Sequence, residues 1–175
     1  MRTSRIVVCV VLVCVAACAL AQQPSAVGTW KLNLSKSDFG KQPAPKSATI
    51  VITDDKDNSL KWTYKYVAAD GKVTNDSFAG AFDGKPYPVK GDPMFATGAF
   101  TRKGSDISIA WKMKDGSTET ETSTMSGDTM TNKTSGKSGA TTQVWERVKT
   151  ASAMAAKAGQ KKSPVTPAAK KSVSK

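Results

Sequence analysis

Residues 60–66, LKWTYKY, alternate between large apolar and polar side chains along their whole length. Leu60, Trp62 and Tyr64 fall on one face, with lysines and a threonine on the other. A two-residue period is typical of a β-strand with one buried face. The Asp-Gly pair at positions 70 and 71 follows, and this pair is favoured in tight hairpin turns. The segment therefore predicts a strand that opens an antiparallel hairpin.

The same alternation recurs on both sides of this strand, as in residues 27–34 and 107–113. Asp-Gly, Ser-Gly and Pro-containing turn signals separate nine or ten such segments, and none shows a helical apolar stripe. Short connections make sequential strands neighbours, and closure of the sheet removes exposed edges. We therefore predict an all-β fold, a single antiparallel up-and-down β-barrel of 8–10 strands. Pro86 and Pro88 lack ladder donors, so we expect no central strand there.

Two late segments, 117–125 and 129–134, differ from the rest because they are rich in threonine and poor in bulky apolar residues. One interpretation is a cavity with a polar wall. The other is a solvated outer face above ordinary core residues, and we favour it because antiparallel sheets commonly expose one face to water. Glu119 and Glu121 share a strand face, as a glycosidase pair would, but we interpret them as part of that solvated face.

The two ends of the chain differ in composition from the centre. Residues 1–21 have the basic start, apolar stretch and Ala-Leu-Ala cleavage site of a secretory signal peptide, and no later segment is apolar enough to span a membrane. Val15-Ala16-Ala17-Cys18 resembles a lipobox, so anchoring through Cys18 is the alternative. Residues 149–175 are rich in Lys, Ala and Pro, and we expect a disordered basic tail. One domain remains, at 22–148.

Charge and residue types exclude several functions. The net charge of +12 arises mainly from the leader and from seven lysines in 149–175, so the domain itself is nearly balanced. The chain has no histidine, and its three cysteines, Cys9, Cys14 and Cys18, all lie in the leader. Histidine-based catalysis and the usual zinc, haem and iron–sulfur ligands are therefore missing. Asp54, Asp55 and Asp57 fail the EF-hand spacing and predict a turn. We expect no catalytic residue, no metal and no cofactor.

Aromatic residues dominate the faces that we expect to point inward, and most of them belong to the core. If a cavity exists, Trp62, Tyr64 and Trp111 are the candidates for its lining, because apolar pockets rely on such walls.

Two motifs resemble those of known proteins. Gly28-Thr29-Trp30 resembles the Gly-x-Trp motif of lipocalins, in which the tryptophan closes the barrel base under an arginine from the last strand, here Arg147. Residues 82–89, FDGKPYPV, look like a motif of small bacterial exported proteins described as lipocalin-like. The usual lipocalin disulfide and C-terminal helix are missing. The resemblance implies a calycin-type barrel, closed by Gly28, Trp30 and Arg147, that holds a small hydrophobic molecule.

We therefore expect an exported protein, periplasmic or secreted, that binds a small apolar or amphipathic ligand without covalent chemistry. The alternative is a non-enzymatic envelope module whose surface and basic tail, 149–175, contact anionic polymers or lipids. We expect no specific nucleic-acid partner.

Overall fold

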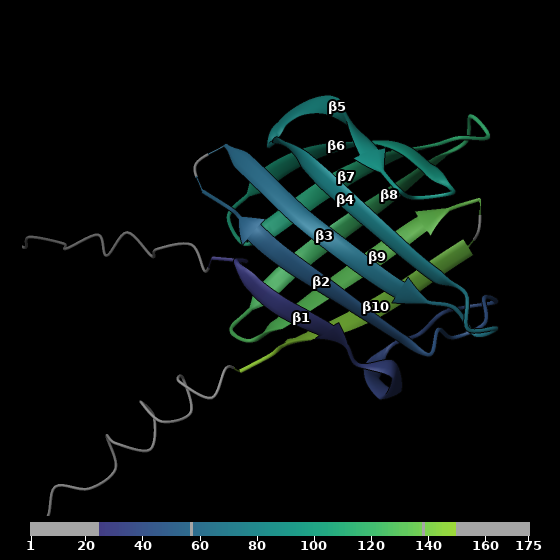
Figure 1. Cartoon of the computed structure of the whole chain (residues 1–175). Helices are drawn as coiled ribbons and strands as arrows, with labels where there is room; N and C mark the ends of the chain where they lie inside the picture. The colour runs from purple at the N-terminus through teal and green to yellow at the C-terminus, as the bar shows by residue number, and fades with distance from the viewer. Residues whose placement is uncertain (1–24, 57, 138, 150–175) are drawn as a thin grey trace, which may run out of the picture.

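The computed structural model of the chain describes residues 25–56, 58–137 and 139–149. Within them, ten antiparallel strands form one closed barrel, in which sequential strands pair and β1 pairs with β10 (Figure 1). This confirms the predicted all-β, up-and-down barrel; the leader and residues 150–175 lie outside the described residues. The strands are β1 (Gly28–Leu32), β2 (Ser47–Asp54), β3 (Ser59–Val67), β4 (Val73–Ala81), β5 (Asp83–Lys90), β6 (Phe95–Lys103), β7 (Asp106–Met113), β8 (Thr118–Ser126), β9 (Thr129–Gly136) and β10 (Gly139–Arg147).

The first strand ends earlier than the alternation predicts. β1 stops at Leu32, and a 3-10 helix, η1 (Leu34–Lys36), follows it. The Asn33 side chain accepts a hydrogen bond from the Lys36 backbone amide and so caps this turn. The alternation that we read over residues 27–34 therefore does not extend to Leu34, whose side chain is exposed.

Residues 86–88 form part of a strand, β5, and at these residues the strand pairs on one side only, in keeping with the expectation of no central strand there. β5 pairs with β6 through Pro86, Tyr87 and Pro88, yet its described pairs with β4 number just two, Ser77↔Lys90 and Phe78↔Val89. The prolines are tolerated because β5 forms most of its ladder on one side, as an edge strand does. The resulting seam between β4 and β5 is filled by side chains, with the Tyr87 ring edge-on to Phe78 at a centroid distance of 6.3 Å.

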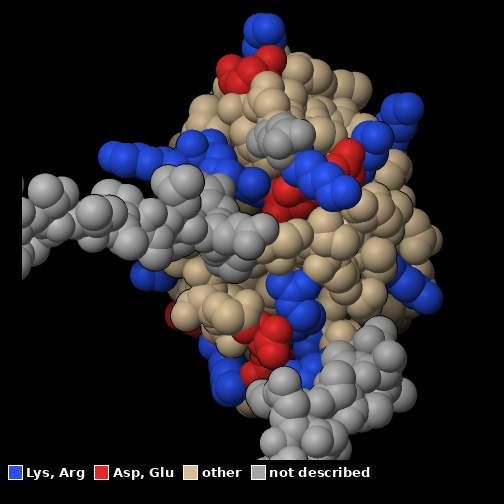
Figure 2. All heavy atoms as spheres, turned by 90° about the vertical axis from the view of Figure 1, so that its left-hand side faces the viewer, with Lys and Arg blue, Asp and Glu red and all other residues tan. Residues whose placement is uncertain are grey.

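One end of the barrel, the base, is closed by the residues that the lipocalin resemblance singled out. Trp30 is fully buried, and the Arg147 guanidinium lies 4.2 Å from the centre of its indole. Arg147 also donates hydrogen bonds to the carbonyls of Ser25 and Val27. A Cβ on Gly28 would lie 2.7 Å from Arg147 Nη1, so the glycine leaves room for the guanidinium. Figure 2 views this end and shows acidic and basic side chains lying next to one another.

A buried ion pair completes the base. Asp55 accepts a hydrogen bond from the Ala26 backbone amide and forms a salt bridge with Arg102. The Arg102 guanidinium in turn lies 3.8 Å from the centre of the Phe82 ring. Asp55 follows the end of β2, as the predicted turn requires. Through its bonds to Ala26 and Arg102, its carboxylate also links the start of the described chain to β6.

The opposite end, the mouth, is formed by five connections, including the long one between β1 and β2 (Figure 1). Asp38, in this connection, exchanges two backbone hydrogen bonds with Thr142 of β10. The Val144 amide donates to the Ser37 hydroxyl at 2.9 Å. These bonds hold Ser37 and Asp38 against β10, where the connection turns toward the mouth.

Candidate functional site

The barrel encloses a cavity of about 410 Å³ that opens toward the mouth. Pockets for small molecules commonly have volumes of about 300–1,000 Å³. Phe39, Pro43 and Pro45 of the β1–β2 connection cover part of it. The remaining lining comes from the inward faces of the strands, which form two chemically different walls.

The aromatic wall lies on β3, β6 and β7, and Phe78 of β4, which is not on the cavity surface, packs against it. Trp62 stacks on Phe78 with a centroid distance of 5.6 Å, and Phe78 contacts Phe100 at 4.5 Å. Phe100 then lies edge-on to Trp111 at 5.4 Å. All three residues predicted as candidate lining, Trp62, Tyr64 and Trp111, lie on the cavity surface. The signal that located them was the two-residue alternation of their strands.

A glycine makes room for the Trp111 indole. Gly98 of β6 pairs with Trp111, and a Cβ on Gly98 would lie 2.6 Å from the indole ring. Since real Cβ contacts are essentially never that close, any other residue at 98 would displace the indole ring.

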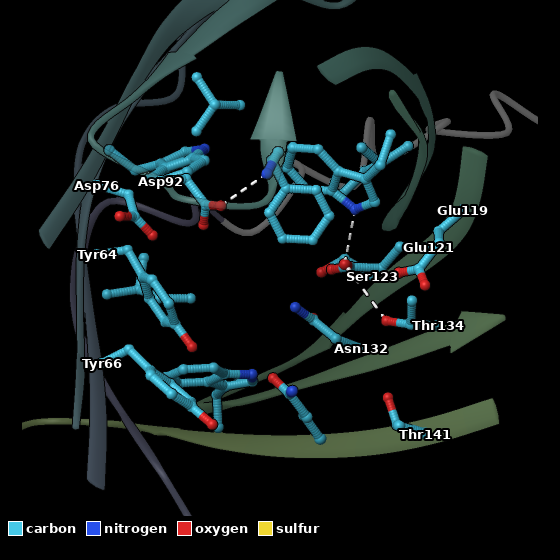
Figure 3. Close-up of a pocket in the computed structure, with 18 of the residues that line it drawn as sticks. Tyr64, Tyr66, Asp76, Asp92, Glu119, Glu121, Ser123, Asn132, Thr134 and Thr141 are labelled. Atoms are coloured by element: carbon cyan, nitrogen blue, oxygen red, sulfur yellow. Dashed lines mark hydrogen bonds between the residues drawn. The ribbon is translucent and has the colours of Figure 1, made fainter. Parts of the chain in front are cut away.

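The polar wall lies on β8, β9 and β10. Burial alternates along β8, and Glu119 and Ser123 are buried with their side chains on the inner face. Our interpretation of Glu119 and Glu121 as a solvated outer face is therefore wrong. The alternation itself was correct, but the threonines occupy the outer face of β8 and the glutamates the inner one. The polar residues of this wall are Glu119, Glu121, Ser123, Asn132, Thr134, Thr141 and Gln143 (Figure 3).

Glu121 is held at the centre of the polar wall. Its Oε2 accepts a hydrogen bond from Trp111 Nε1 at 3.0 Å and a longer one from the Thr134 hydroxyl at 3.5 Å (Figure 3). Burial raises the pKa of Glu121, the two hydrogen bonds lower it, and the charge of Glu119 raises it further. Glu119 lies opposite Gly136, where a Cβ would be 2.4 Å from the glutamate Cγ.

A second pair of acidic residues on the cavity wall is Asp76 of β4 and Asp92 of the connection between β5 and β6 (Figure 3). Burial and the neighbouring Asp92 carboxylate raise the pKa of Asp76 to about 7, and Lys114 opposes this shift. Asp92 Oδ1 accepts hydrogen bonds from the backbone amides of Met94 and Phe95. Lys114 Nζ donates to the Asp92 carbonyl.

Our sequence analysis missed both aspartates. Asp76 is in phase with Phe78 and Gly80, so the period of β4 already placed it on the inner face. Asp92 offered no such signal, because it sits in a connection that folds inward after Gly91. A Cβ on Gly91 would lie 2.2 Å from the Asn75 carbonyl oxygen, and the residue has a φ of +89°.

Three buried polar atoms on the cavity wall make no hydrogen bond with the described residues: Asp76 Oδ1, Asn132 Oδ1 and Trp145 Nε1. Leaving a buried polar group without a partner is costly, so these atoms are free to bind water or a ligand. Tyr64 adds a phenol whose pKa is raised by burial, so it remains protonated and can donate a hydrogen bond.

The described part of the chain has no candidate metal site and no helix that could span a membrane. No group of three or more Asp, Glu, His or Cys side chains is placed to hold a metal ion. No described helix is long and apolar enough to cross a membrane.

Several solved structures have similar backbones, fatty acid binding proteins among them. A mutant of the fluorescent protein UnaG superposes with a TM-score of 0.53 at 16% identity, covering 71% of this chain and 97% of that one. A Schistosoma mansoni fatty acid binding protein in complex with arachidonic acid gives 0.52 at 15% identity, covering 70% and 96%. The present chain has a calycin-like barrel. Fatty-acid-binding protein 1 of Echinococcus granulosus gives 0.50 at 12% identity, covering 71% and 98%.

No protein-family model and no curated protein matches the sequence. At these identities the likeness to solved structures concerns the fold alone. The calycin-type architecture implied by the Gly-x-Trp resemblance is thus supported, while membership of the small bacterial exported group remains an expectation.

Proposed function

We propose that this protein binds a small amphipathic molecule non-covalently inside its barrel. The observation that carries the proposal is the cavity of about 410 Å³ with an aromatic wall facing a polar one. Burial of apolar surface favours binding by about 25 cal/mol per Å², and a few placed polar groups orient the molecule. Fatty acid binding proteins share the barrel architecture, which supports this choice over an enzymatic role.

We further propose that the chain acts outside the cytoplasm. The leader at 1–21 supports export to the periplasm or the medium, and anchoring through Cys18 is the alternative. The mass of the mature N-terminus in the native host distinguishes the two, because a cut after Ala21 removes Cys18 and lipidation retains it.

Native mass spectrometry of residues 22–175, purified from the host without denaturation, tests the binding function. We expect a stoichiometric small-molecule adduct that disappears after denaturing extraction. Trp111→Ala should reduce the adduct because it removes aromatic surface from the cavity and a hydrogen bond to Glu121. Val73→Ala is the matched control, because Val73 is an exposed apolar residue outside the cavity lining.

Deleting residues 150–175 separates this proposal from an envelope module that acts through its basic tail. The cavity predicts an unchanged adduct after the deletion and weak dependence on salt. Loss of the adduct on deletion, with Trp111→Ala still loaded, would contradict cavity binding. Folding of each variant is checked by its thermal midpoint, so that a misfolded Trp111→Ala protein is not counted as a binding defect.

A further inference from the structure

The cavity contains acidic groups without basic partners on its surface. Asp76, Asp92, Glu119 and Glu121 all line it, and no lysine or arginine does so among the described residues. The chain has no histidine. The domain as a whole is nearly balanced in charge, but every charged side chain on the cavity surface is a carboxylate. Such an arrangement is unfavourable unless protons or a cationic ligand compensate the negative charge.

The pair formed by Asp76 and Asp92 has one nearby cation, Lys114. Lys114 Nζ donates to the Asp92 backbone carbonyl rather than forming an ion pair with either carboxylate within 4.0 Å. Asp92 Oδ1 is occupied by two backbone amides, while Asp76 Oδ1 is buried and has no partner among the described residues. One carboxylate oxygen on the cavity wall is therefore available to a donor.

The other acidic pair, Glu119 and Glu121 on β8, has no salt bridge with any described lysine or arginine. Both hydrogen bonds recorded for Glu121 reach Oε2, and within the described residues none reaches Oε1. Glu119 has neither a hydrogen bond nor a salt bridge through its carboxylate with any described residue. The two glutamates therefore leave carboxylate oxygens free for a bound donor.

Independent of the carboxylates, two further atoms on this wall lack partners. The Trp145 indole N–H is buried in a side chain that is 1% exposed, and the Asn132 side-chain oxygen is also buried without a partner. Both residues line the cavity, with Asn132 and Glu121 on the same wall (Figure 3). The Asn132 oxygen needs a donor, as the carboxylates do, whereas the Trp145 N–H needs an acceptor, such as water or another polar atom of the bound molecule.

We infer that the cavity selects an amphiphile whose head group is a protonated amine, and that it discriminates against carboxylates. This inference rests on the proposed binding function and specifies its ligand class. An ammonium group carries three N–H donors and a positive charge, which match the free carboxylate oxygens and the Asn132 oxygen. Indole and phenol faces around it add cation–π attraction. A carboxylate head group would instead be repelled by every ionised group on the wall.

Three ligands with one chain length test the inference: decylamine, decanol and decanoic acid, each titrated calorimetrically below its micelle concentration into residues 22–175 at pH 7.5. We expect decylamine to bind at least about tenfold more tightly than decanoic acid, with decanol between them. Equal or tighter binding of decanoic acid overturns the inference.

Charge-neutral variants locate the effect. Glu121→Gln and Asp76→Asn preserve side-chain size, and at least one should weaken decylamine binding about tenfold while leaving decanol within about twofold. Asp106→Asn is the control, because Asp106 is an exposed carboxylate on β7 that contacts Thr124. Unchanged decylamine affinity in both cavity variants overturns the inference, since a general surface attraction would then explain the preference. A variant that misfolds loses decanol binding as well as decylamine binding. Because Asp76→Asn and Glu121→Gln are independent substitutions, the test still works if one of them misfolds.

The failure of the inference differs from failure of the binding function. If none of the three ligands binds and the native protein carries no adduct, cavity binding itself fails. If decanol and decanoic acid bind while decylamine does not, the cavity is a binding site and the head-group inference alone is wrong.

Discussion

At the scale of single residues, Arg147 connects the strand that closes the barrel to the chain that precedes β1. Its guanidinium covers the Trp30 indole and donates to two backbone carbonyls, those of Ser25 and Val27. A weaker ion pair joins Arg147 Nε to Asp128 at 3.4 Å. Charged hydrogen bonds and a partly buried cation–π contact are each worth about 1–2 kcal/mol.

We expect Arg147→Ala to lower the free energy of unfolding by about 2–3 kcal/mol, because it leaves two backbone carbonyls and the indole face without a partner. Urea denaturation measures the change. Lys149→Ala serves as the control, since Lys149 is half exposed and contacts Asp128 at 3.6 Å, and it should change stability by less than about 0.5 kcal/mol. Equal effects from the two variants would show that Arg147 does not close the base.

Asp76 predicts an unusual dependence of stability on pH. Its pKa is raised from 3.8 to about 7 in the folded protein, so between these values the folded state binds more protons than the unfolded state. The free energy of unfolding should therefore fall as pH rises from about 4 to 7 and level off above that. Glu121, whose pKa is also raised by burial, contributes with the same sign.

Asp76→Asn should remove roughly 1–2 kcal/mol of this decline, a value reduced from the full linkage because water in the cavity and Lys114 screen the carboxylate. Denaturation curves between pH 4.5 and 8 measure it. Asp106→Asn should retain the decline, because Asp106 is exposed. A wild-type protein whose stability rises through this pH range would rule out a protonated Asp76.

At the scale of the elements, the β4–β5 seam is the weakest join in the barrel. Its two described pairs contrast with the eight consecutive pairs between β8 and β9. Gly80 accommodates aromatic rings at this seam, since a Cβ there would lie 2.6 Å from the Phe78 ring and 2.8 Å from Tyr87. Side-chain contacts thus replace backbone hydrogen bonds where the prolines lie.

Amide hydrogen exchange should therefore be fastest at this seam. We expect seam-facing amides of β4 and β5 to exchange at least about tenfold faster than amides shared by β8 and β9, because few ladder bonds must open. Two-dimensional NMR after transfer to D₂O measures the rates residue by residue. Uniform protection around the barrel would contradict the prediction and would imply hydrogen bonds across the seam.

At the scale of the whole molecule, the barrel divides into a closed base and a cavity with a mouth. The base contains the buried Trp30 indole and the compensated charges, Asp55 with Arg102 and Arg147 over Trp30. The cavity contains the uncompensated ones. This separation keeps the stabilising contacts away from the cavity, so changes at Glu121 and Asp76 can be tested with the base intact.

The alternation of apolar and polar residues, together with the turn signals, determined the barrel class. The alternation also determined the inward positions of Trp62, Tyr64 and Trp111, because side chains on a strand alternate between faces whatever the neighbouring strand is. It also contained the inward position of Asp76. Residue type alone misled the interpretation of Glu119 and Glu121, since burial of a carboxylate is uncommon and a solvated face is the usual arrangement.

Tertiary structure decided which strand face became the interior and how completely it was filled. The inward fold of Asp92 and the Asp55–Arg102 pair depend on residues far apart in sequence, so local pattern carries no trace of them. The partial pairing of β5 was indicated only by its prolines. The cavity itself is a volume left by ten strands closing together. Its size depends on every inward side chain at once, and no segment of the sequence determines it.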